Sequence, residues 1–335
     1  MNTPLLRVDS LCVDATVDNQ LRPIVTNVSF DLEAEGALGI VGESGSGKSM
    51  TLRAIQRLLA PGVHVRGEVL FDGTDVYAMN AKQLRRWRSR DIAMIYQDCR
   101  AHINPVRTIG DFLTEGLTTC RGVNRTDAVK AATEQLRAVG ISDGQRRLNQ
   151  YPHQLSGGLL QRVMIASALL TDPKLILADE PTTALDVTMQ EEVMAILNDL
   201  RTQRGLAMIL VTHDLELAAA VSDRIAVMYA GMFVEFGDTV PIHRNTLHPY
   251  SAGLLASRPS IDQRVRLHPI PGRPRAAYEV ARGCRFAERC SFTTDDCTSI
   301  EQSLHLVDDH LVACCRAEQL AGQLSLHTES TGATL

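Results

Sequence analysis

The stretch that most constrains this chain is "GESGSGKS" at residues 42–49, which fits the pattern G-x-x-x-x-G-K-[ST]. The apolar run at 36–42 predicts a buried strand, and residues 49–59 predict a helix. Glycines let the backbone wrap closely around phosphates, and the helix N-terminus adds its positive end. A chance Gly/Ser-rich turn would not need a strand and a helix on its two sides. The loop therefore predicts a nucleotide site, with phosphate contacts from Gly42, Ser44, Gly45, Gly47 and Lys48 and a Mg²⁺ ligand in Ser49.

Short apolar runs alternate with helical patterns through the middle of the chain. Buried strands separated by helices are typical of a parallel sheet that is covered on both faces. The sequence therefore predicts an α/β fold of the P-loop NTPase kind, with further buried strands at 92–96, 174–179, 207–213 and 224–229.

The pattern of apolar residues and the positions of the prolines also predict a division into domains. Residues 6–15 and 24–34 partly alternate between apolar and polar, as half-exposed antiparallel strands do. After about residue 237 repeated prolines break the chain. The expected organisation is a nucleotide-binding domain at 1–240 with an antiparallel β subdomain and a helical subdomain at about 98–170, a small loop-rich C-terminal domain at 241–322, and a disordered tail at 323–335.

Composition excludes several classes of protein. The net charge is −5 and aromatic residues make up 4% of the chain, so neither a basic stripe nor a stacking platform for nucleic acid is expected. We see no signal peptide and no uninterrupted apolar run of membrane-spanning length. A soluble, cytoplasmic protein is expected, in which structural disulfides are disfavoured.

Acidic side chains follow the apolar run that ends at Asp179. Asp179 is placed to assist Mg²⁺, and Glu180 could orient or deprotonate a water that attacks the γ-phosphate. His213 ends the run at 207–213. An acidic helix cap and a structural histidine are the plain alternatives. The carboxyl ends of parallel strands meet at the edge where such folds bind ligands, which favours the functional interpretation.

The stretch "LSGGLLQR" at 155–162 narrows the class of protein. Ser156 and the two glycines after it, at the start of a helix, can offer a hydroxyl and backbone N–H groups to an anion. Together with the phosphate loop, Gln97 in "IYQD", "LILADE", "ALD" at 184–186 and "VTHD", this stretch resembles the ATP-binding cassette (ABC) family over about residues 5–240.

The resemblance implies roles for individual residues. Two cassettes of this family pair head to tail, so Ser156, Gly157 and Gly158 would serve the ATP of the partner. Gln97 would contact Mg²⁺ or the attacking water, Asp186 would bridge the cassettes, and His213 would hold the γ-phosphate. The family usually stacks adenine on an aromatic side chain, but the corresponding position here is Ala15. We therefore hypothesise that selectivity for adenine is poor.

The end of the chain resembles one branch of that family. "LHPYSAGLLAS" at 247–257, "PIPGRP" at 269–274 and "NPVRTIGD" at 104–111 are similar to segments of the oligopeptide/dipeptide/nickel importer ATPases. The resemblance implies an ATPase subunit at the cytoplasmic face of the membrane that powers import of peptides, or of nickel or metal chelates. Its expected partners are a paralogous ATPase subunit, two permease subunits and an extracytoplasmic substrate-binding protein. The rival functions are a soluble cassette protein of DNA repair or translation and a redox-sensing module with degenerate ATPase sites.

A run of cysteines lies in this last segment. Cys284, Cys290, Cys297 and Cys314 are spaced C-x5-C-x6-C-x16-C, and Cys315 is expected to be a spectator. Zinc sites usually have closer pairs, and the reducing compartment disfavours a disulfide. Some members of the branch carry an iron–sulfur cluster here, so the resemblance implies a [4Fe–4S] cluster. Ordinary buried thiols remain the open alternative.

Overall fold

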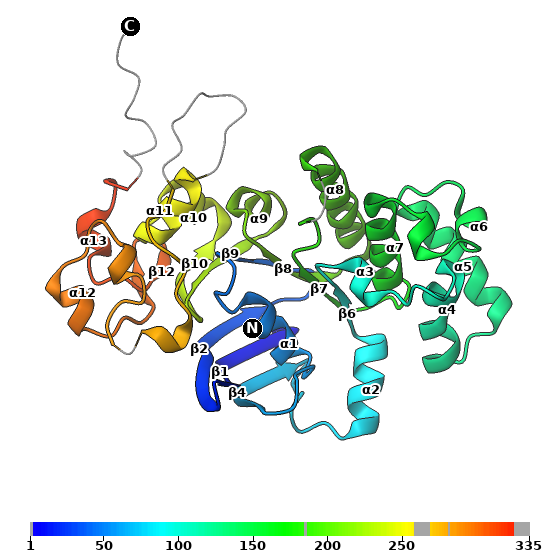
Figure 1. The fold of residues 1–335 in the computed structure, drawn as a ribbon, viewed down its shortest axis with the longest axis horizontal. Helices are drawn as coiled ribbons and strands as arrows, with labels where there is room; N and C mark the ends of the chain where they lie inside the picture. Colours follow the sequence, from blue (N-terminus) through cyan, green and yellow to red (C-terminus); the bar gives the residue numbers. More distant parts are fainter. Residues whose placement is uncertain (1–2, 184–185, 258–268, 281, 325–335) are drawn as a thin grey trace, which may run out of the picture. The chain divides into compact units, whose positions relative to one another are not determined.

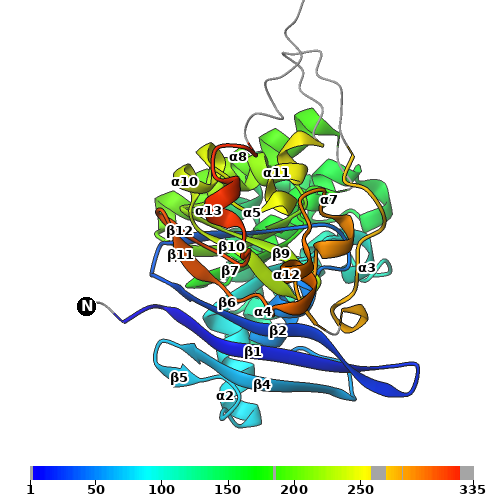
Figure 2. The same cartoon turned by 90° about the vertical axis from the view of Figure 1, so that its left-hand side faces the viewer.

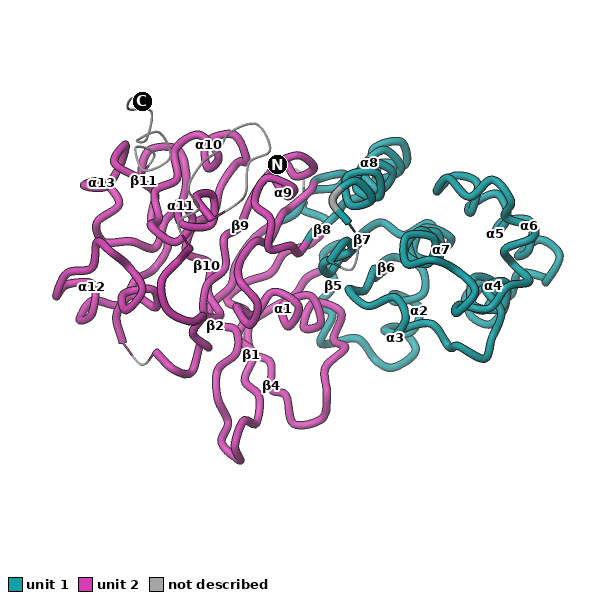
Figure 3. Tube along the Cα trace, turned by 45° about the horizontal axis from the view of Figure 1, so that its top comes forward, with its two compact units in different colours: residues 1–5, 32–36, 71–210 teal, residues 6–31, 37–70, 211–335 magenta. Residues whose placement is uncertain are grey.

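The computed structural model describes residues 3–183, 186–257, 269–280 and 282–324 (Figure 1). The expected disordered tail lies outside the described residues from residue 325 onward. The chain forms two compact units (Figure 3). Unit 1 comprises Met1–Leu5, Leu32–Gly36 and Phe71–Leu210, and unit 2 comprises Leu6–Asp31, Ala37–Leu70 and Val211–Leu335. These units are defined by compactness in space, and the domain boundary near residue 240 stays a prediction.

Unit 2 contains a small sheet of long strands (Figure 2). β1 (Leu6–Val17) lies between β2 (Gln20–Leu32) and β4 (Val63–Phe71). Asp18 and Asn19 link the first two strands with φ angles of 49° and 60°. Two consecutive residues with positive φ are typical of a tight hairpin turn, which makes β1 and β2 antiparallel as the sequence predicts.

A second sheet of unit 2 carries the phosphate loop. β3 (Ala37–Val41) pairs in parallel with β9 (Arg224–Tyr229). β10 (Met232–Asp238) is antiparallel to β9, β12 (His310–Val312) is antiparallel to β10, and β11 (His305–Val307) is antiparallel to β12. Strands from beyond residue 300 thus extend a sheet that begins at residue 37.

Two short helices of unit 2, α9 (Leu215–Val221) and α10 (Thr239–Arg244), pack against strands of this sheet. A core under them includes Val41, Tyr229, Tyr250 and Phe286, all buried. The α-helices of unit 2 are α1 (Lys48–Ile55), α9 (Leu215–Val221), α10 (Thr239–Arg244), α11 (Pro249–Ala256), α12 (Asp295–Ser299) and α13 (Ala317–Leu320), and the 3-10 helices are η2 (Ala277–Glu279) and η3 (Ala287–Arg289).

Unit 1 combines parallel strands with a group of helices. β7 (Leu175–Asp179) is parallel to β6 (Ile92–Ile95), and β8 (Ala207–Thr212), which ends in unit 2, follows in the strand order. The other elements are β5 (Thr74–Asp75), α2 (Ala81–Arg90), α3 (Cys99–His102), α4 (Ile109–Cys120), α5 (Arg125–Ala138), α6 (Gly144–Arg147), the 3-10 helix η1 (Pro152–Gln154), α7 (Gly157–Leu169) and α8 (Val187–Arg204).

Two further observations bear on the sequence predictions. The helix after the phosphate loop ends at Ile55 rather than at residue 59, because Arg57 has a left-handed φ of 54° that an α-helix does not accept. Among the described residues, no helix is long and apolar enough to cross a membrane.

Candidate nucleotide site and cysteine cavity

The glycines of the phosphate loop serve two different purposes. Gly45 and Gly47 have φ angles of 81° and 108°, which favour glycine. Gly42 is required for another reason, since a Cβ built there would lie 2.1 Å from the carbonyl oxygen of Met228 in β9. The loop therefore leaves β3 in close contact with the neighbouring strand.

Lys48 is fixed against the loop that it closes. Its side chain is buried, and Nζ donates to the carbonyl oxygens of Gly42 at 2.7 Å and Glu43 at 2.9 Å. Behind it, the Thr51 hydroxyl donates to the carbonyl oxygen of Gly47 at 3.1 Å. The ammonium group thus stays within the turn whose N–H groups are expected to face phosphates.

Unit 1 brings two predicted site residues into direct contact. Gln97 Nε2 donates to Glu180 Oε2 at 3.0 Å, and the Thr183 hydroxyl donates to the same oxygen at 2.8 Å. Asp179, buried, ends β7 directly before Glu180. Glu180 itself has a φ of 44°, and such strained backbone clusters at functional sites. Sequence reasoning missed Thr183, which no motif singled out.

The two glycines after Ser156 differ in their surroundings. Ser156 is the N-cap of α7, and its hydroxyl accepts from the Leu159 N–H at 3.4 Å. A Cβ on Gly157 would meet open space, whereas one on Gly158 would lie 2.3 Å from the Met189 methyl group in α8. A side chain at position 158 would therefore require the Met189 side chain to move aside, whereas Gly157 leaves the start of the helix uncovered.

The remaining predicted residues sit at element ends. Asp186 caps α8 by accepting from the Met189 N–H at 3.0 Å, while Ala184 and Leu185 lie outside the described residues. His213 lies between β8 and α9 in unit 2, the unit that holds the phosphate loop. Gln97, Asp179, Glu180, Ser156 and Asp186 belong to unit 1.

Comparison with known proteins decides the family. The ABC transporter model matches residues 25–183, and the model of the oligopeptide/dipeptide transporter C-terminal region matches residues 234–297. The oligopeptide transport ATP-binding protein OppD of Haemophilus influenzae is 41% identical over 88% of this chain and 91% of its own. The chain belongs to the ABC transporter family.

Other similar proteins agree with this assignment. A putative peptide import ATP-binding protein of Brucella abortus is 42% identical to this cassette protein, over 93% of this chain and 94% of its own. A solved structure, the dimeric ATP-binding cassette MJ0796 in a post-hydrolysis state with ADP and Pi, has a TM-score of 0.63 and 29% identity. It covers 70% of this chain and 98% of its own. The predicted P-loop NTPase fold is confirmed.

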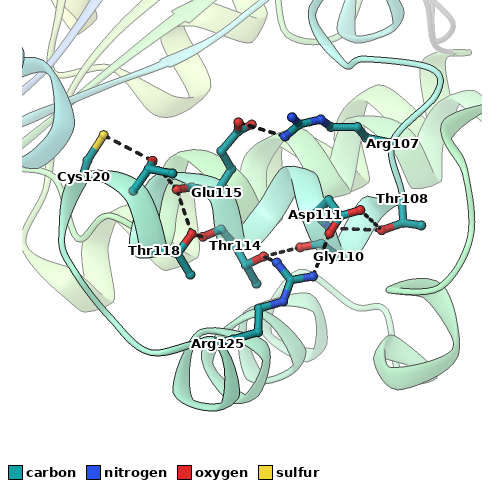
Figure 4. Close-up of polar contacts among 10 residues, drawn as sticks. Arg107, Thr108, Gly110, Asp111, Thr114, Glu115, Thr118, Cys120 and Arg125 are labelled. Carbon is teal, nitrogen blue, oxygen red and sulfur yellow. Dashed lines mark hydrogen bonds and ion pairs between the residues drawn. The ribbon is translucent and has the colours of Figure 1, made fainter.

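Polar contacts organise the segment "NPVRTIGD" of this ABC protein (Figure 4). Thr108 caps α4 by accepting from the Asp111 N–H at 3.1 Å. Arg125 in α5 donates to the Asp111 carboxylate at 2.7 Å and to the Thr114 hydroxyl at 2.6 Å. The segment is therefore anchored to both α4 and α5. Val106, by contrast, is 79% exposed.

Cys284, Cys290, Cys297 and Cys314 all line one hollow in unit 2. Water-sized molecules can occupy about 10 Å³ of this hollow, and Phe286, Phe292 and Leu320 complete much of its wall. Cys315 does not line this hollow and is exposed, but its sulfur lies 3.8 Å from that of Cys297. All the cysteines are free thiols. We call this hollow the cysteine cavity.

One wall of the cysteine cavity carries a histidine with an unused donor. His248 is buried, and its Nδ1 accepts from the Tyr250 N–H at 3.0 Å. Burial lowers the pKa of His248 to about 3, so the ring is neutral and its proton resides on Nε2. Among the described residues this Nε2 has no hydrogen-bond partner. A buried donor without a partner is costly, so an acceptor placed beside this Nε2 would stabilise the protein.

The thiols of the cavity are mostly protonated as they stand. Burial raises the pKa of Cys284, Cys290 and Cys314 to about 11. Burial acts the same way on Cys297, but hydrogen bonds with Thr294 hold its pKa below the ordinary value. Among the described residues, no group of three or more His, Cys, Asp or Glu side chains is arranged to hold a metal ion.

Proposed function

We propose that this chain is the ATP-hydrolysing subunit that powers a membrane importer of peptides. The observation that carries the ATPase part is the Glu180 carboxylate, held by Gln97 and Thr183 directly after Asp179, in a chain with an intact phosphate loop. The cargo is proposed from the relatives, whose names refer to oligopeptide transport and peptide import. Nickel and metal chelates are the alternative cargo, which the names of these relatives do not mention.

In the proposed mechanism the chain positions reactants rather than bonding to them. The loop N–H groups and Lys48 bind the phosphates. Glu180 orients a water molecule. The water oxygen attacks the γ-phosphorus while Glu180 accepts a proton from the water, and ADP leaves. Mg²⁺, when bound, neutralises phosphate charge, and the chain's residues for it are Ser49, Gln97 and Asp179. The other proposed contacts are His213 to the γ-phosphate, Asp186 across the cassette pair, and Ser156, Gly157 and Gly158 to the partner's ATP.

Glu180→Gln tests the ATPase proposal. The amide keeps the size of the side chain and still accepts hydrogen bonds, but it cannot take the proton. We expect ATP binding to be retained, turnover to fall by about a hundredfold or more, and closed cassette pairs to accumulate in ATP. Glu191→Gln, at an exposed position of α8, is the matched control and should hydrolyse ATP normally. Undiminished turnover in Glu180→Gln would reject Glu180 as the key carboxylate.

The proposed partners are two permease subunits, an extracytoplasmic substrate-binding protein and a second, paralogous ATPase subunit, which places the chain peripherally at the cytoplasmic face of the inner membrane. The exposed Val106, on a segment anchored by Arg125, supports a permease contact near residues 97–111. Capture of the full-length chain from detergent extracts should bring permease subunits with it. Recovery of ribosomal or DNA-repair partners alone would favour the soluble-cassette rival.

We also propose that the cysteine cavity holds a [4Fe–4S] cluster, with Cys284, Cys290, Cys297 and Cys314 as its ligands. Thiolates of this kind hold such clusters, which supply a one-electron redox centre when bound. The Nε2–H of His248 would donate to a sulfur there. Anaerobically purified protein should contain iron and absorb near about 400 nm.

Matched cysteine variants sharpen this test. Cys290→Ser should lose the iron and the absorbance. Cys315→Ser, which changes a neighbouring thiol outside the cavity wall, should keep both. Colourless, iron-free wild-type protein, or equal loss in the two variants, would contradict the proposed ligand set.

A further inference from the structure

Glu43, the second residue of the phosphate loop, is held by side chains from the far end of the sequence. Its backbone N–H donates to the Tyr250 hydroxyl at 2.7 Å. Its carboxylate accepts from Arg289 Nη1 at 2.6 Å and Nη2 at 3.0 Å. Its carbonyl oxygen accepts from Lys48 Nζ. Every polar group of Glu43 is thus engaged, and all the partners belong to unit 2.

Arg289 is itself fixed on every side. Its side chain is 4% exposed, and Nε donates to the Pro271 carbonyl oxygen at 2.6 Å. The guanidinium lies 5.7 Å from the ring centre of Tyr229 and 5.8 Å from that of Phe286. A bidentate pair with a carboxylate adds direction as well as energy. Arg289 therefore fixes the position of the Glu43 carboxylate rather than merely lying near it.

Tyr250 supplies the second anchor. Its ring is fully buried against Tyr229 and Phe286, with ring centres 4.7 Å and 5.3 Å away. Burial raises the pKa of Tyr250, so the hydroxyl stays protonated and neutral. The Glu43 N–H that it accepts from is engaged and is not offered to a phosphate.

Electrostatics gives these contacts a consequence for ATP. A carboxylate in a phosphate-binding loop repels the phosphates unless its charge is balanced. Arg289 balances this charge and holds the side chain in a fixed direction. Without that pair the loop would carry an uncompensated negative charge at its second residue.

We infer that Arg289 and Tyr250 are positioning residues for ATP binding, which hold the phosphate loop through Glu43; this rests on the proposed ATPase function. Both anchors adjoin the cysteine cavity in the sequence. Arg289 directly precedes Cys290, and Tyr250 lies two residues after His248, and both of those neighbours line the cavity. The segment that bears the cysteines thus helps to hold the phosphate loop in position.

The decisive experiment measures ATP affinity of the full-length chain in a set of variants. Arg289→Gln leaves the Glu43 carboxylate unpaired, and we expect the Kd for ATP to rise about tenfold. The kcat at saturating ATP should change by less than about threefold, because Glu180 is untouched. Adding Glu43→Gln to Arg289→Gln removes the unpaired charge and should restore most of the lost affinity.

Arg273→Gln is the matched control. Arg273 forms a more exposed pair with Glu279 in unit 2, at 2.6 Å and 2.9 Å, and has no hydrogen bond with Glu43 among the interactions described. It should leave the Kd unchanged. Tyr250→Phe, which removes only a hydroxyl, is the second variant in case Arg289→Gln does not fold, and its Kd should rise about threefold.

Two results would overturn the inference. One is an ATP affinity unchanged in both Arg289→Gln and Tyr250→Phe. The other is a double variant as weak as Arg289→Gln, since that would mean Arg289 acts only by supporting Pro271 and Tyr229. Failure of the wild-type chain to bind ATP would instead reject the proposed function, so the two failures are distinguishable.

Discussion

At the scale of single residues, His310 links the last strands of the chain to the main sheet of unit 2. Its Nε2 lies 2.8 Å from Glu235 Oε1 and its Nδ1 lies 3.0 Å from Asp309 Oδ1. A carboxylate oxygen beside each ring nitrogen favours the form of the ring that carries a proton on both nitrogens. Burial alone would lower the pKa of His310, but the hydrogen bonds to Glu235 and Asp309 raise it above its ordinary value. Glu235 is also fully buried.

His310→Gln should therefore destabilise the protein, because it removes the cation that offsets a buried carboxylate. We expect a loss of about 3 kcal/mol in the free energy of unfolding. Because the folded-state pKa is raised, the stabilisation is complete below the unfolded-state value and is lost as pH rises through the folded-state value. The difference between wild type and variant should thus be larger at about pH 6 than at about pH 9.

Urea unfolding at the two pH values measures this difference. The control is His305→Gln, at an exposed position of β11 whose ring contacts only the Ser303 carbonyl oxygen among the interactions described. A stability difference for His310→Gln that does not change with pH would contradict the cationic assignment.

At the scale of elements, the path of the phosphate loop depends on how closely β3 approaches β9. Gly42→Ala would place a methyl group against the Met228 carbonyl oxygen, a backbone atom that cannot move aside by itself. We expect a loss of about 1–3 kcal/mol in stability, together with weaker ATP binding. Thermal unfolding and nucleotide titration measure the two effects.

Gly116→Ala is the control for this prediction. Gly116 lies within α4, where a Cβ would meet open space. Alanine favours a helix over glycine, so this variant should be as stable as wild type or slightly more stable. Similar losses in both variants would show that the Met228 contact is not the cause.

Helices and strands that have a clear local sequence pattern could be predicted from the sequence. The apolar runs at 92–96 and 224–229 correspond to β6 (Ile92–Ile95) and β9 (Arg224–Tyr229), because strands buried on both faces leave continuous apolar letters. β12 (His310–Val312) has three residues and no such signature. The Glu43–Arg289 pair joins residues 246 positions apart, and no local pattern encodes a contact at that separation. The residues of the motifs could therefore be identified from the sequence, whereas distant residues that hold them in place, such as Arg289, could not.

At the scale of the whole molecule, the ATP motifs are divided between the two units, while the phosphate loop and the cysteine cavity share unit 2. On the inference above, Arg289 and Tyr250 connect the cysteine-bearing segment to the phosphate loop within unit 2. Helix α7, which follows Ser156, belongs to unit 1, and on the proposed function its start serves the ATP of another cassette. The phosphate loop and the start of α7 are thus proposed to act on different ATP molecules.

This division leads to a prediction for the proposed pair with a paralogous ATPase subunit. Ser156→Arg places a bulky side chain where α7 begins, so it should suppress hydrolysis at the ATP bound by the partner, by about a hundredfold. Glu180→Gln should suppress hydrolysis of the ATP bound by this chain. Affinity of the isolated chain for ATP should be unchanged by Ser156→Arg, because that residue would not contact its own nucleotide. ATP can be photo-crosslinked to the subunits, and separating the subunits then shows which of them retains the nucleotide. Retention on the same subunit in both variants would contradict the head-to-tail arrangement.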